Sequence, residues 1–76
     1  MKKALDQLNK GQSGVILSIK GRGAVHRRLL DMGLVKNNTV KVERAAPLGD
    51  PIEIRIKGYC LSLRKEEAKN ILVDVQ

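Results

Sequence analysis

Residues 39–57 read TVKVERAAPLGDPIEIRIK, and this stretch decides the fold. Apolar and polar side chains alternate in residues 39–44 and 51–57, which is typical of strands with one buried and one solvated face. The connection AAPLGDP carries turn-forming residues and predicts a hairpin loop. Glu43 and Glu53 lie in the outward rows together with basic residues, and opposite charges there can pair across the strands.

Further strands are indicated on both sides of this hairpin. The segments VILSI at 15–19, CLSL at 60–63 and ILVDV at 71–75 are rich in β-branched and apolar residues. Near the start of the chain, Leu5 and Leu8 have the spacing of a short helical turn, which we expect to pack as a lid.

The strongest helical signal covers Ala24 to Met32. On a helical wheel, three apolar residues fall within about 60° of one another and predict a core-facing stripe: Val25, Leu29 and Met32. Gly33 follows at the position of a left-handed C-terminal cap, and Leu34 can fold back on the last turn. A second, shorter helix is predicted from Lys65 to Asn70.

A chain of 76 residues forms one small domain, which we place at residues 1–76. Glu66 and Glu67 lie in the first turn of the second helix, where they suit the helix dipole. About five short strands and two short helices are too few for a sandwich. The sequence therefore predicts a mainly β fold, a small SH3-like barrel formed by a strongly bent sheet.

The positive charge is concentrated near the first helix. The formal net charge is +7, and residues 1–36 hold eight Lys and Arg against two Asp. Four basic residues fall within nine positions around the loop Gly21-Arg22-Gly23: Lys20, Arg22, Arg27 and Arg28. Such a cluster attracts a negatively charged partner, while the alternative is a solvated face that keeps a small protein soluble. His26 and Leu30, on the helix flank, form a candidate contact patch.

The rare residue types exclude several function classes. A single tyrosine, with no Phe or Trp, cannot form the aromatic floor of a proline-helix groove or the stacking platform of an RNA-binding sheet. His26 and Cys60 are each the only residue of their type, and no nucleophile motif surrounds them. We therefore expect no enzymatic activity. A single cysteine also excludes an intramolecular disulfide and suits a cytoplasmic protein.

A metal site has weak support in the sequence. Zinc sites need three or four Cys or His ligands at short spacing, and the chain has one of each. Fe(II) or another divalent transition metal accepts carboxylates and one imidazole. His26, Asp31 and Cys60 are the candidate ligands, with Met32 or Asp50 as additional ones, and we expect no required cofactor.

Three motifs in order give the chain a resemblance to a known family. RLLDMGL at 28–34 is followed by APLGDP at 46–51, and then by a glycine-to-helix segment that begins at Gly58 and contains LRKEEA at 63–68. Together these motifs resemble the FeoA family, ferrous iron transport protein A, over nearly the whole chain. The sequence departs from the family at Asn37-Asn38, where Pro-Gly is usual. Asn tolerates the left-handed conformation, so the turn can persist.

The resemblance implies an SH3-like barrel and an accessory or regulatory role in ferrous iron uptake. FeoA-like proteins accompany FeoB, a membrane permease with a cytoplasmic G-protein domain, and we expect protein–protein contact with that region at the inner face of the membrane. The candidate contact residues lie on the first helix with its entry loop and on the hairpin tip: Arg22, His26, Arg27, Arg28 and Leu30; Leu48, Gly49 and Asp50.

Two alternatives remain open. A small basic barrel can bind nucleic acid, although the acidic residues of the hairpin would repel phosphates and stacking residues are missing. A related barrel forms the C-terminal domain of some iron-dependent repressors, so the second alternative is a metal-sensing domain, which would need a DNA-binding partner chain to act as a repressor. The sequence does not decide whether the barrel associates with itself.

Overall fold

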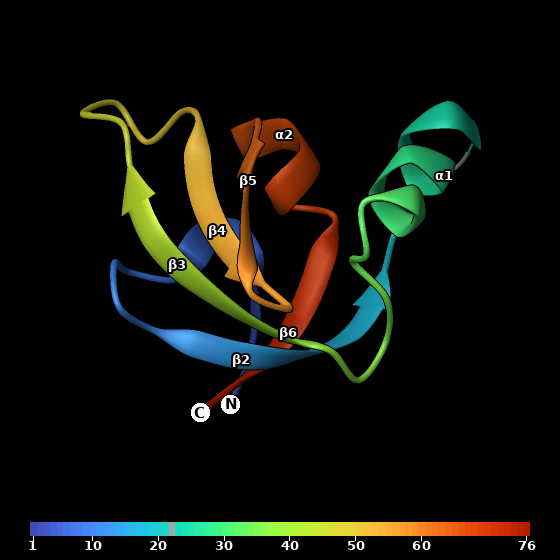
Figure 1. Cartoon of the computed structure of the whole chain (residues 1–76), viewed down its shortest axis with the longest axis horizontal. Coiled ribbons are helices and arrows are strands. Elements are labelled where there is room, and N and C mark those ends of the chain that lie inside the picture. Colours follow the sequence, from blue (N-terminus) through green and yellow to red (C-terminus); the bar gives the residue numbers. More distant parts are fainter. Residues whose placement is uncertain (22) are drawn as a thin grey trace.

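The computed structural model describes residues 1–21 and 23–76, and these form six strands, two α-helices and one 3-10 helix. Figure 1 shows them in chain order. Their bounds are β1 (Lys2–Ala4), η1 (Leu5–Gln7), β2 (Ser13–Ile19), α1 (Gly23–Asp31), β3 (Thr39–Ala45), β4 (Ile52–Ile56), β5 (Tyr59–Leu63), α2 (Lys65–Ala68) and β6 (Ile71–Val75). The mainly β architecture predicted from the sequence is confirmed.

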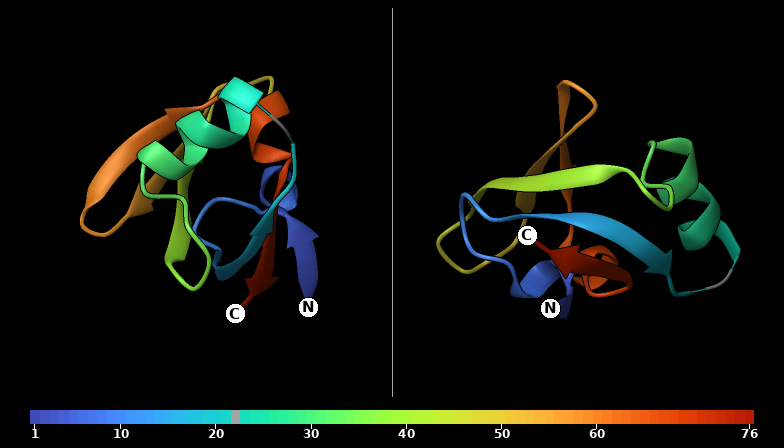
Figure 2. Two further views of the ribbon diagram at one scale, coloured as in Figure 1. Left: turned by 90° about the vertical axis from the view of Figure 1, so that its right-hand side faces the viewer. Right: turned by 90° about the horizontal axis from the view of Figure 1, so that it is seen from below.

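All neighbouring strands are antiparallel, in the order β1-β6-β2-β3-β4-β5. The hairpin of β3 and β4 forms as expected, with Val42 opposite Ile54. The sixth strand, β1, was not expected, because its three residues include two lysines and show no alternation. It pairs with β6, and Figure 2 shows the two ends of the chain side by side on these strands.

Two irregularities in strand register help the sheet to bend. The register of β2 against β6 shifts between Ile16 and Ser18, and that of β3 against β4 shifts between Val42 and Arg44. Such bulges increase local twist and curvature. Within the described residues the two edge strands, β1 and β5, do not pair with each other, so the sheet is not closed by hydrogen bonds. The short helices η1 and α2 contact each other.

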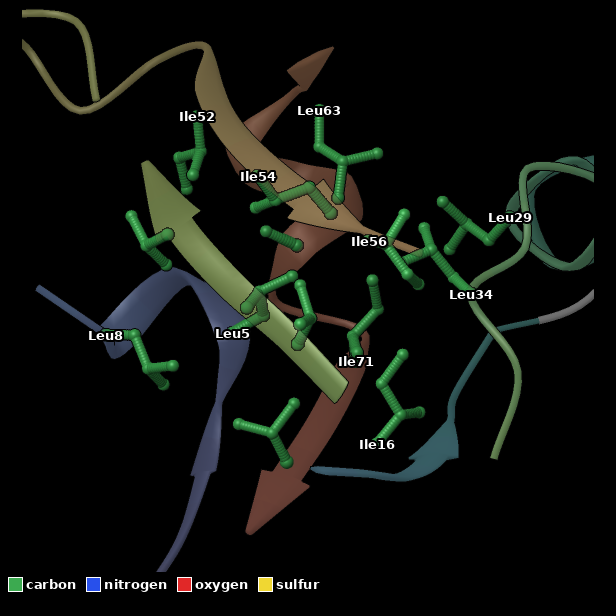
Figure 3. Packing of buried hydrophobic residues seen from close by; sticks show 14 residues of the cluster. Leu5, Leu8, Ile16, Leu29, Leu34, Ile52, Ile54, Ile56, Leu63 and Ile71 are labelled. Carbon is green, nitrogen blue, oxygen red and sulfur yellow. The ribbon is translucent and has the colours of Figure 1, made fainter. Parts of the chain in front are cut away.

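The core fills the inside of the bent sheet (Figure 3). Its buried residues come from nearly every element: Leu5, Leu8, Ile16, Leu29, Leu34, Val40, Val42, Ile52, Ile54, Ile56, Leu63, Ala68, Ile71 and Val73. The alternating apolar residues of β3 and β4 all face inward. Leu5 and Leu8 are buried at and just after η1, so the expected lid at the start of the chain is present.

The outward row of the hairpin carries paired charges. Arg55 pairs with Glu43, and Arg44 pairs with Glu53 at 2.7 Å between Nε and Oε2. The hydrogen bond from Arg55 lowers the pKa of Glu43, and the same contact raises the pKa of the Arg55 guanidinium. The predicted cross-strand pairing is confirmed, and both glutamates are therefore occupied within the fold.

Helix α1 and the β3–β4 loop lie at opposite ends of the molecule. Figure 1 places the helix at one end of the longest axis and the loop at the other. The molecule is 29 Å long in its longest dimension. None of the helices formed by the described residues has the length and apolar character needed to traverse a membrane.

Candidate functional site

Helix α1 contacts the barrel through a narrow strip. Of its nine residues, all of which the structure describes, only Leu29 is buried. Val25 is 43% exposed, so the predicted core-facing stripe is wrong at this residue, while Met32 is half-buried against the core. A helical wheel shows which residues share a face of the helix. How many of them are buried depends on how wide a strip of the helix the barrel surface covers. Val25 and Leu30, which is 39% exposed, lie on either side of that strip.

The C-terminal end of α1 is fixed by the predicted glycine cap. Gly33 has φ of 91°, in the left-handed region. Its N–H donates to the carbonyl of Leu30 at 3.0 Å, and the N–H of Leu34 donates to the carbonyl of Leu29 at 3.1 Å. This pair of bonds is the Schellman motif. Leu34 is fully buried, so the chain folds back into the core immediately after the helix.

The only tyrosine closes the same end of the helix. The hydroxyl of Tyr59, on β5, donates a hydrogen bond to the carbonyl of Met32 at 2.7 Å. A Cβ on Gly33 would lie 2.6 Å from that hydroxyl oxygen. Glycine is therefore needed at residue 33 both for its backbone conformation and for the space that Tyr59 occupies.

An ion pair joins the last turn of α1 to α2. Nη1 of Arg28 lies 2.8 Å from Oε2 of Glu67, and the other carboxylate oxygen accepts the backbone N–H of Arg64 at 3.0 Å. Glu67 is 6% exposed. The sequence indicated only a favourable charge in the first turn of α2. Glu67 lies three residues after the N-cap Arg64, a spacing that indicates a side chain accepting the N-cap N–H. The contact of Glu67 with Arg28 had no signal in the neighbouring sequence.

The basic residues of α1 line a surface groove. The groove is open, with a volume of about 490 Å³, and is lined by Gly23, Ala24, Arg27, Arg28, Asp31 and Met32. Arg27 and Arg28 are both exposed, and Arg28 is paired with Glu67 while 58% of its side chain stays accessible. Arg22, predicted to belong to the contact face, lies outside the described residues. The groove therefore presents the guanidinium of Arg27 to solvent in a lining that also contains Asp31, Ala24 and Met32.

The candidate metal ligands are not gathered into one site. His26 and Asp31 lie on α1, and Cys60 is exposed on β5 opposite Arg55. Across residues 1–21 and 23–76, no group of three or more His, Cys, Asp or Glu is placed to hold a metal ion. His26 is half-buried, and its Nδ1 has no hydrogen-bond partner among the described residues.

The hairpin tip presents one leucine on a well-supported loop. Leu48 is 91% exposed. Beside it, the N–H of Gly49 donates to the carbonyl of Ala46 at 2.7 Å, and Oδ1 of Asp50 accepts the backbone N–H of Lys65 at 3.1 Å. Asp50 thus satisfies a donor at the start of α2, a structural role that the sequence did not reveal. This second candidate face lies far from α1 (Figure 1).

Comparison with known proteins agrees with this geometry. A family model described as the FeoA domain matches residues 3–75. Over 71 residues the chain is 42% identical to a Porphyromonas gingivalis fusion of Fe(2+) transport protein A with the Fe(2+) transporter FeoB; the match spans 93% of this chain and 8% of that protein. The chain thus corresponds to a small part of the fusion protein's length.

Two solved structures are similar over most of both chains. A FeoA-like protein from Clostridium acetobutylicum is 40% identical, with a TM-score of 0.90, covering 97% of this chain and 86% of the other. The Stenotrophomonas maltophilia FeoA, a prokaryotic SH3 domain protein complexed with zinc, is 31% identical, with a TM-score of 0.82 and coverage of 97% and 89%.

A manganese-dependent transcriptional repressor shares the fold at a TM-score of 0.90. It is 17% identical, with coverage of 99% of this chain and 41% of the repressor. At that identity the likeness extends to the fold alone. Because the family model spans residues 3–75 and the bent sheet matches that of solved FeoA structures, this chain belongs to the FeoA family of ferrous iron transport proteins.

Proposed function

We propose that this protein is an accessory protein of ferrous iron uptake that docks on the cytoplasmic region of a FeoB-like permease through the exposed side of α1. The observation that carries the proposal is the helix itself, which leaves Leu30 and Arg27 exposed although its C-terminal end is firmly anchored. Support for the partner comes from the Porphyromonas gingivalis relative, in which a FeoA unit and a FeoB unit share one chain. Covalent linkage gives two units that act together a high effective concentration.

The charges and the apolar residues serve different steps of docking. The basic cluster beside α1 accelerates encounter with an acidic surface, an effect that falls as salt is added. Leu30 supplies apolar area that becomes buried in the complex. A permease partner would hold the protein at the inner face of the membrane. The proposal requires no bound metal and assigns no chemical step to the protein.

The experiment that tests the docking face is a titration of ¹⁵N-labelled protein with the cytoplasmic region of the permease. We expect shifts confined to residues 20–34 and their immediate neighbours. Leu30→Ser should weaken binding about tenfold, the loss expected for an interface anchor of about 1.4 kcal/mol. Arg27→Gln should lower the association rate at low salt and have little effect at high salt.

Leu48→Ser is the matched control, because it removes an equally large and even more exposed leucine from the opposite end of the molecule. If Leu48→Ser weakens binding and Leu30→Ser does not, docking takes place at the hairpin tip. If no residue between 20 and 34 shifts at saturating partner, the proposal for α1 is wrong.

A further inference from the structure

We infer that Glu67 is the positioning residue of the docking helix: it fixes the orientation of α1 through Arg28, and Arg28 supports partner binding through Glu67 rather than by touching the partner. This inference rests on the proposed function, since it concerns the same helix. It assigns a binding role to a buried carboxylate that lies on α2, outside the docking face.

The carboxylate of Glu67 is held on two sides. One oxygen accepts the backbone N–H of Arg64 at 3.0 Å, and the other forms an ion pair with Nη1 of Arg28 at 2.8 Å. The neighbouring Ala68 is fully buried, and α2 contacts η1, so this turn moves with the barrel. Glu67 is 6% exposed, and burying a carboxylate costs free energy unless other groups compensate its charge. Glu67 therefore favours the arrangement in which Arg28 stays beside it.

Helix α1 depends on this contact because its apolar attachment is small. Leu29 is the one buried residue in the described helix, so the apolar contact between α1 and the barrel is narrow and does not by itself fix the orientation of the helix. The bond from Tyr59 to the carbonyl of Met32 holds the chain just after the helix, and the ion pair to Glu67 holds the last turn. These two polar contacts lie about one helical turn apart and fix the last turn, which carries Leu30.

The test compares two neighbouring glutamates of α2. Glu67→Gln keeps an oxygen acceptor for the N–H of Arg64 but removes the charge that faces Arg28. Glu66→Gln removes the same charge from an exposed neighbour on the same turn and is the control. Amide hydrogen exchange of α1 in the free protein should accelerate about fivefold in Glu67→Gln, as expected when a coupled contact is lost. It should stay unchanged in Glu66→Gln.

Partner affinity is then measured in a double-mutant cycle with Arg28→Met and Glu67→Gln. Each single variant should bind the cytoplasmic region of the permease about fivefold more weakly, and the double variant no more weakly than either one. Arg28→Lys, which keeps a positive charge near the carboxylate, should recover most of the affinity. A purely destabilising effect would lower the unfolding temperature without giving this non-additive pattern or the recovery by lysine.

The possible failures separate the two ideas. If exchange in α1 is unaffected by Glu67→Gln, the positioning role is wrong whatever the binding result. If the losses of the two single variants multiply in the double variant, Arg28 contacts the partner directly and the inference is overturned. If exchange accelerates while affinity for the permease stays unchanged, Glu67 does hold the helix, but α1 is not the docking surface and the proposed function fails.

Discussion

Substitution of Gly33 by alanine should destabilise the protein through two separable effects. An L-residue held at φ of 91° costs about 1–2 kcal/mol. The new Cβ would also lie 2.6 Å from the hydroxyl oxygen of Tyr59. Moving the hydroxyl aside breaks its bond to the carbonyl of Met32, a net loss of about 1 kcal/mol. Together these give about 2–3 kcal/mol, which corresponds to a fall in Tm of about 8–24 °C for a domain of this size.

The assay is urea unfolding of four proteins: wild type, Gly33→Ala, Tyr59→Phe and the double variant. Phenylalanine lacks the hydroxyl, and the nearest remaining ring atom, Cζ, would lie 3.9 Å from the new Cβ, which is ordinary contact. Gly33→Ala should therefore cost only about 1–2 kcal/mol in the Tyr59→Phe background, where the conformational cost alone remains. The double variant should be about 1 kcal/mol more stable than the sum of the two single losses implies. Strict additivity would refute the argument that the hydroxyl occupies the space next to Gly33.

Four further substitutions test the packing, the charge pairing and the cap. Leu29→Ala should lower the free energy of unfolding by about 2–5 kcal/mol, measured by thermal unfolding. Val25→Ala, at a 43% exposed position, should change that free energy by about 0.5 kcal/mol or less. Equal losses in the two variants would contradict the narrow contact between α1 and the barrel. Because Arg55 lowers the folded-state pKa of Glu43, that carboxylate adds stability above its unfolded pKa and loses it as the pH falls through the folded value. Glu43→Gln should therefore flatten the stability profile below about pH 4.5, which is checked by urea unfolding from pH 2 to 7; an unchanged profile would show that the pair contributes nothing. Asp50→Ala removes the side-chain acceptor at the start of α2 and should cost about 0.5–2 kcal/mol, seen as a lower urea midpoint at an unchanged m-value; an unchanged midpoint would show that water replaces the carboxylate.

Local sequence patterns predicted the elements whose signals repeat or stand at a fixed offset. The alternation in residues 39–57 was enough for the hairpin, because a period of two places every second side chain on the same face. The cap at Gly33 followed from its place after the last helical residue. Strand β1 was not predicted because a segment of three residues is too short to show an alternating pattern. Asn37 has φ of 77°, as expected for a turn without glycine.

The candidate site was only partly predictable. The sequence identified α1 as the basic, partly apolar helix, and it identified Leu30 as a residue of its flank. It also assigned Arg28 to the contact face, where the structure shows that residue paired with Glu67. The sequence could not distinguish Glu66 from Glu67, although one is exposed and the other buried. The roles of these residues depend on which surface faces them.

By itself, the sequence determined five of the six strands that the described residues form, both α-helices, where the chain turns, and which family it belongs to, since these follow from periodicity and from motifs at short spacing. Only the tertiary structure decided how wide a strip of α1 is covered, that Asp50 and Glu67 serve α2, and that the two candidate faces lie at opposite ends. The physical reason is that burial and ion pairing depend on segments distant in the chain. Arg28 and Glu67 are 39 residues apart, and only the bent sheet brings them to 2.8 Å.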